Sequence, residues 1–193
     1  MAFIDEQTDT NTRRREFDLE ANGRTVSGVL WSPPQPDAGR PLVCLGHGAS
    51  GDRHQPPLPW LAAKLVADHG WFALSMGTIY GAPLVGSEPR IEAAVLGLMG
   101  MTGPDHYQPT LQVAASAITC PVLFVIQLED ELFTRVQCLA LFDALASTDK
   151  RLHANPGLHP EVPIEELHHS VTFLVERLEG RPIERGPTFD VSQ

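Results

Sequence analysis

The sequence predicts one α/β domain with an N-terminal antiparallel hairpin, a mainly parallel sheet, helices on both faces and no separate lid domain. Its length of 193 residues suits a single domain. Apolar and polar residues alternate on both sides of Asn22-Gly23, a pattern typical of a β-hairpin. Further along, short apolar runs alternate with helical stretches, as in a parallel sheet buried on both faces.

The expected elements follow from these patterns in chain order. The two strands of the hairpin lie within residues 16–31. Continuous apolar runs predict buried strands at 42–45, 71–74, 93–99, 122–127 and 151–154. The other stretches predict helices at 59–69, 76–85, 132–146 and 165–178, of which the last two are long and amphipathic. We expect the domain to span residues 16–180, with a flexible segment over 1–15 before it and a tail over 181–193 after it.

Composition excludes several classes of function. The chain has 14 Lys and Arg against 24 Asp and Glu, a formal charge of -10, so nucleic acid would be repelled. No apolar run reaches the ~18 residues of a membrane span. Three cysteines cannot form a closed set of disulfides, and the N-terminus lacks the apolar core of a secretory signal. We therefore expect a cytoplasmic protein in a reducing environment, with neither nucleic acid nor a membrane as its partner.

A glycine-rich turn follows the first apolar run, in Leu42-Val-Cys-Leu-Gly-His-Gly-Ala-Ser-Gly51. Ligands of open α/β sheets bind at the carboxyl ends of strands, where this turn lies. The backbone N–H of Ala49 is a candidate oxyanion donor. A plain strand-to-helix turn supported by His47 explains the glycines equally well. The turn is not a P-loop, because no Gly-Lys-Ser/Thr follows.

A candidate nucleophile stands in Ala73-Leu-Ser-Met-Gly77. This segment matches the elbow G-x-S-x-G with Ala73 in place of the first glycine. Ser75 would then lie just past a strand, where the N–H of Met76 favours an oxyanion. The alternative is that Ser75 only caps the next helix.

Two further segments carry an acid and a base. The apolar strand before Gln127-Leu-Glu-Asp-Glu131 ends in three carboxylates, of which Asp130 is the first choice and Glu129 the second for holding an imidazole. An acidic helix start is the alternative. His159 lies on a Pro-Gly turn after the last strand, in the right place for a general base. The side chains of the adjacent His168 and His169 point about 100° apart on a helix, so the two are poorly placed to bind one metal ion together.

The order Ser75, Asp130, His159, each after a separate strand, is the order of α/β-hydrolases. Through these motifs residues 16–178 resemble that superfamily, in particular its dienelactone-hydrolase-like and small esterase branch. The resemblance implies Ser75 as nucleophile, Asp130 as acid, His159 as base, and Ala49 and Met76 as oxyanion-hole donors. Dienelactone hydrolases use a cysteine, so the serine favours ordinary small esters. We expect a small-molecule ester substrate, no cofactor and no metal. The sequence leaves both a monomer and a homo-oligomer open.

The chain departs from that family in one connection. Only 27 residues separate His47 from Ser75, enough for one helix and one strand, where the family has a helix, a strand and a second helix in about 50 residues. Either the sheet has closed over a deletion, or the sequence omits an internal segment near Leu74. We favour the omission and expect a break in the chain there. A real deletion would instead favour a non-catalytic hydrolase-like binding or scaffold protein.

Overall fold

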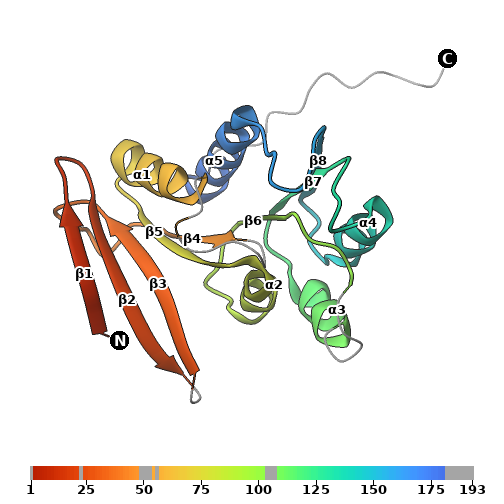
Figure 1. The fold of residues 1–193 in the computed structure, drawn as a ribbon, viewed down its shortest axis with the longest axis horizontal. Helices are drawn as coiled ribbons and strands as arrows, with labels where there is room; N and C mark the ends of the chain where they lie inside the picture. The colour runs from red at the N-terminus through yellow and green to blue at the C-terminus, as the bar shows by residue number, and fades with distance from the viewer. Residues whose placement is uncertain (1, 22–23, 48–53, 55–56, 103–107, 181–193) are drawn as a thin grey trace.

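A computed structural model describes residues 2–21, 24–47, 54, 57–102 and 108–180 (Figure 1). Several predicted features lie outside these residues. They are the Asn22-Gly23 turn, Ala49 with the rest of the glycine-rich turn, and the tail over 181–193.

The N-terminal part is antiparallel. It comprises β1 (Ala2–Thr8), β2 (Arg13–Ala21) and β3 (Arg24–Ser32). Strands β2 and β3 pair from Arg13↔Ser32 to Ala21↔Arg24, which confirms the hairpin. The prediction of a flexible segment over residues 1–15 is wrong for residues 2–8, which form β1, and for residues 13–15, which belong to β2. This strand pairs with β2, and the ring of Phe3 packs against that of Phe17 with centroids 6.5 Å apart.

The remaining strands form two groups. A five-stranded sheet has the order β1-β2-β3-β5-β4, and a three-stranded sheet the order β6-β7-β8. Pairing is parallel between β4 and β5 and throughout the second sheet. The bounds are β4 Leu42–His47, β5 Phe72–Gly77, β6 Ala94–Gly97, β7 Val122–Gln127 and β8 Lys150–Asn155.

The parallel sheet is interrupted between β4 and β6. We expected one sheet, but these two strands are not hydrogen-bonded neighbours. Strand β5 runs unbroken through Leu74 and Ser75, so the expected break in the chain is not present there. One strand thus stands where the family arrangement has two, and the sheet has not closed over the missing unit.

Five helices cover the strands in the described part of the chain. Their bounds are α1 Pro57–His69, α2 Thr78–Ser87, α3 Gln108–Ala117, α4 Arg135–Ala144 and α5 Ile164–Leu178. Helices α1 and α5 lie on one side of the sheets, and α2, α3 and α4 on the other (Figure 1). Four were predicted, and α3 was not. None of these described helices is long and apolar enough to cross a membrane.

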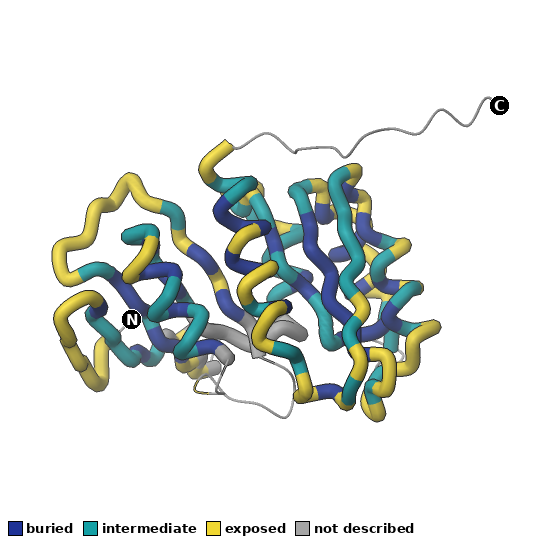
Figure 2. The backbone as a smooth tube through the Cα atoms, turned by 90° about the horizontal axis from the view of Figure 1, so that it is seen from above, coloured by how far each residue is buried: buried dark blue, intermediate teal, exposed yellow. Residues whose placement is uncertain are grey.

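Side chains bridge the interruption in the sheet. One buried cluster contains Val43 and Leu45 of β4 together with Leu123 and Val125 of β7, under helices α1 and α5. A second cluster lies on the opposite face, around Phe124. The buried residues are concentrated on the inner strands and the inward sides of the helices (Figure 2). Apolar packing therefore joins the two sheets where the hydrogen-bonded ladder does not.

Candidate active site

Asp130 and His159 meet at the carboxyl ends of β7 and β8. These strands are parallel neighbours, so the turns that follow them lie side by side. The Nδ1 atom of His159 lies 2.9 Å from Oδ2 of Asp130. Only 10% of the His159 side chain and 1% of the Asp130 side chain are exposed. The structure thus brings together two of the three predicted catalytic residues.

The surroundings of Asp130 keep its carboxylate ionised. Its Oδ1 accepts backbone hydrogen bonds from Leu132 at 2.8 Å and Phe133 at 2.9 Å. Burial raises the pKa of Asp130, but the hydrogen bonds from His159, Phe133 and Leu132 and the charge of His159 together hold it below its ordinary value. An ionised carboxylate only accepts hydrogen bonds, so Nδ1 of His159 is the donor. The lone pair of Nε2 is then left to act as a base.

The loop that carries His159 is held by main-chain hydrogen bonds to carboxylates. Three consecutive N–H groups each donate to a different acidic side chain: Gly157 to Glu129, Leu158 to Glu161 at 2.8 Å, and His159 to Glu131 at 2.9 Å. The bond from His159 lowers the pKa of Glu131 below its ordinary value. Gly157 has a φ of 111°, which L side chains rarely adopt, so glycine is required at this turn.

The amide of Gln127 supports the same loop from beneath. Its Nε2 lies within hydrogen-bond distance of three loop carbonyls: Glu161 at 2.8 Å, Pro156 at 3.3 Å and Leu158 at 3.4 Å. Gln127 is 2% exposed and ends β7. Sequence reasoning treated this residue as part of the strand only. The available signal was the polar Gln127 directly after five apolar residues.

The second-choice acid Glu129 has a different role from Asp130. It accepts the N–H of Gly157, whereas Asp130 contacts the imidazole. The roles of Glu131 and Glu161 in the loop were not foreseen. These three glutamates hold the main chain of residues 157–159, whereas Asp130 contacts the imidazole ring of His159.

Ser75 lies inside a strand. We expected the strand to end at Leu74 and Ser75 to stand on the turn beyond it. Instead β5 continues to Gly77, and α2 begins at Thr78. The parallel ladder with β4 accounts for the extension, because pairing runs on to His47↔Gly77. Ser75 itself pairs with Val29 on one side and Leu45 on the other.

This placement separates the serine from the dyad. Strand β4 and the interruption lie between β5 and the sheet that carries Asp130 and His159. Neighbouring strands lie about 4.8 Å apart, so each intervening strand adds about that distance. Met76, the expected oxyanion donor, pairs with Gly46 in the ladder, and the second expected donor, Ala49, is outside the described residues.

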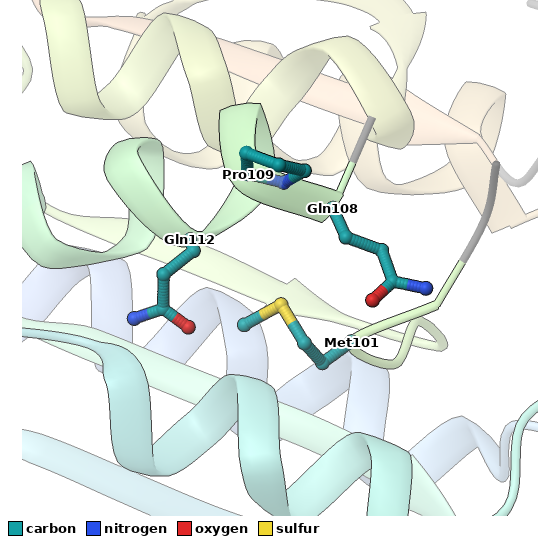
Figure 3. A pocket seen from close by; sticks show the side chains of 4 residues that line it. All are labelled: Met101, Gln108, Pro109 and Gln112. Atoms are coloured by element: carbon teal, nitrogen blue, oxygen red, sulfur yellow. The ribbon is translucent and has the colours of Figure 1, made fainter. Parts of the chain in front are cut away.

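A cavity of about 280 Å³ opens beside α3. Met101 lines it together with Gln108, Pro109 and Gln112 of that helix (Figure 3). Met101 follows the carboxyl end of β6, and its N–H donates to the carbonyl of Gln137 at 2.8 Å. Neither Asp130 nor His159 is among the residues that line this cavity. Its wall of one thioether, one pyrrolidine ring and two amides carries no charge.

No protein-family model and no curated protein matches the chain. Among solved structures, a cold-adapted esterase from an Arctic intertidal metagenomic library superposes with a TM-score of 0.82 at 29% identity. The match covers 92% of this chain and 100% of that one. The chain has the α/β-hydrolase fold.

Other α/β-hydrolase-fold neighbours are more distant in sequence. An acetyl xylan esterase from Paenibacillus sp. R4 has a TM-score of 0.70 at 15% identity, with 92% of this chain and 88% of that one covered. Est1E from Butyrivibrio proteoclasticus has a TM-score of 0.68 at 13% identity, with 85% and 99% covered. The assignment to the dienelactone-hydrolase-like branch stays a prediction.

Proposed function

We propose that the protein hydrolyses a small carboxylic ester through an acyl-enzyme intermediate. The observation that carries this proposal is the buried hydrogen bond between Asp130 and His159 at the carboxyl edge of an α/β-hydrolase sheet. The 29%-identical neighbour, matched over its whole length, is itself described as an esterase. Ser75 is the nucleophile in this proposal, as the elbow-like segment around it indicates.

The reaction follows from the roles of the three side chains. Nε2 of His159 takes the proton of the Ser75 hydroxyl as Oγ attacks the ester carbonyl, and the N–H groups of Ala49 and Met76 stabilise the oxyanion. The histidine then gives that proton to the leaving alcohol. Water, deprotonated by the same Nε2, attacks the acyl-serine and releases the acid. Asp130 stabilises the imidazolium at both stages.

Three further features support a small uncharged substrate and a cytoplasmic location. The cavity beside α3 has an uncharged wall, and all three cysteines are free thiols. The chain's formal charge of -10 also disfavours an anionic polymer as substrate.

One observation favours a second candidate function, a non-catalytic hydrolase-like binding protein. Ser75 occupies a ladder position between Val29 and Leu45, and β4 stands between its strand and the dyad's sheet. If this placement keeps Ser75 apart from His159, no proton can pass between the two residues. In that case the Asp130–His159 pair would be structural.

Covalent labelling separates the two functions. The folded protein is incubated with a fluorophosphonate probe, and the adduct is located by peptide mass spectrometry. We expect labelling at Ser75, lost in Ser75→Ala and strongly slowed in His159→Ala. Ser87→Ala, at the exposed end of α2, is the matched control and should label normally. A folded protein that stays unlabelled would overturn the proposed ester hydrolysis and favour the non-catalytic function.

A further inference from the structure

Two histidines and one buried carboxylate converge away from the dyad. Among the described residues, His153, Glu166 and His169 form one group whose three nearest ligand atoms all lie within 4.8 Å of one another. Nδ1 of His153 lies 2.9 Å from Oε1 of Glu166, and Nδ1 of His169 lies 4.0 Å from Oε2 of the same carboxylate. The adjacent His168 instead packs its ring against Trp60, with centroids 5.1 Å apart.

We propose that His153, Glu166 and His169 bind a divalent transition-metal ion of the zinc type. Zinc–ligand bonds of about 2.0–2.1 Å in a tetrahedron put neighbouring ligand atoms about 3.4 Å apart. The two His–Glu separations in the structure, 2.9 and 4.0 Å, lie on either side of this value. Two imidazoles with one carboxylate also form the ligand type that first-row transition ions prefer over magnesium or calcium.

The carboxylate is prepared for this role by its surroundings. The Glu166 side chain is only 3% exposed, and Nδ2 of Asn155 donates to its Oε2 at 3.3 Å. A buried carboxylate needs compensating positive charge, which a bound cation supplies fully. The amide of Asn155 orients the ligand oxygen in the way that outer partners of metal ligands commonly do.

The two imidazoles leave the site open to solvent. The side chain of His153 is 36% exposed and that of His169 is 61% exposed. Their rings stand edge to face with centroids 5.7 Å apart. Exposed side chains can adjust by the few tenths of an ångström that coordination requires, and water fills the fourth position.

The ligands come from both ends of one loop. His153 belongs to β8, which ends at Asn155, while Glu166 and His169 belong to the first turns of α5, which begins at Ile164. Residues 156–163, including His159, connect the two. A bound ion therefore cross-links the strand and the helix that anchor this loop, and it should stabilise the folded state by binding to it alone.

Calorimetry and thermal unfolding test the site without any measurement of activity. Untagged protein, stripped with EDTA, is titrated with Zn²⁺ and separately with Mg²⁺. We expect one Zn²⁺ site per chain, a rise in Tm with Zn²⁺, and no binding of Mg²⁺. His153→Ala and His169→Ala should each weaken Zn²⁺ binding by about tenfold or more.

His168→Ala is the matched control, because it removes the neighbouring exposed histidine of the same helix. It should bind Zn²⁺ as the unaltered protein does. Absence of Zn²⁺ binding, or unchanged binding in both His153→Ala and His169→Ala, would overturn the proposal and leave ordinary His–Glu ion pairs. Since fluorophosphonate labelling plays no part in this readout, failure here is distinct from failure of the proposed ester hydrolysis.

Discussion

The backbone N–H of His159 donates a 2.9 Å hydrogen bond to Oε2 of Glu131, the residue directly after the carboxylate that holds its ring. Consecutive carboxylates thus fix the main chain and the side chain of one histidine. The backbone bond limits where the ring can lie, and the ring bond selects its tautomer. Glu131 is therefore a positioning residue for the proposed base.

Replacing Glu131 tests this positioning role. Glu131→Ala should lower kcat for a small nitrophenyl ester roughly tenfold, because a hydrogen bond to a charged acceptor is lost and the loop gains freedom. Glu131→Gln retains an acceptor oxygen and should recover most of the rate. Glu165→Ala, at an exposed position of α5, is the control. Equal rates in Glu131→Ala and Glu165→Ala would show that the bond does not matter.

Asp130→Asn should lower kcat by about 10³–10⁴-fold while the protein remains folded. An asparagine that donates to Nδ1 forces the proton onto Nε2, where no base is then available. Steady-state kinetics and circular dichroism together measure the effect. Asp143→Asn, an exposed acid of α4, should leave kcat unchanged. Activity within a fewfold of the unaltered protein would remove Asp130 from the mechanism.

Acid should unfold the protein in a way that depends on Asp130. Its pKa in the folded state is below the ordinary value of about 3.9, and that of Glu131 is below about 4.3. Such groups stabilise the fold fully above their ordinary pKa, and the contribution is lost as the pH falls through the lowered values. We expect these carboxylates to raise Tm by a constant amount above about pH 5. This stabilisation should decrease as the pH falls below about 4.

The control for the acid effect is Asp130→Asn, which has no carboxylate to protonate at this position. Its Tm starts lower, but it should decline less steeply with acid than that of the unaltered protein. Thermal unfolding from pH 3 to 7 measures both slopes. Parallel curves would show that Asp130 contributes nothing to the acid response.

The elements that sequence patterns predicted well are those with a complete local signal. Strand 122–127 was predicted with its observed bounds, since six apolar or amide residues follow a proline and are buried on both faces. Residues 2–8 form a strand although only Ala2, Phe3 and Ile4 among them are apolar, because backbone pairing with β2 stabilises the extended chain. Helix α3, Gln108–Ala117, was not predicted.

The candidate site was also predicted only in part. Asp130 and His159 could be predicted because each directly follows a strand of the expected parallel sheet, and the structure brings them within hydrogen-bond distance. The hydrogen bonds of Gln127, Glu129 and Glu131 to the loop depend on its path, which no local pattern encodes. Ser75 was placed on a turn by its motif, but long-range pairing with Leu45 extends the strand past it.

The interrupted sheet leads to a prediction about the gene. The strand-helix unit missing between β4 and Ser75 corresponds to roughly 25 residues. Because β5 runs unbroken through Leu74 and Ser75, we expect the codons for Trp71 to Ser75 to be contiguous in the source DNA, so that the unit is truly deleted. Sequencing across these codons measures this directly. An inserted segment of about 25 residues between them would show instead that the sequence omits the unit.

The break between β4 and β6 also bears on how this chain opens and closes. Among the described strands, no ladder crosses the break, and only side chains such as Leu45 and Val125 couple the two sheets. Native proteins open in cooperative units whose boundaries lie where few interactions cross. We therefore expect β6 to β8, with the loop of His159, to open as one such unit and β1 to β5 as another. Amide hydrogens of the two groups would exchange with solvent through separate openings of unequal free energy.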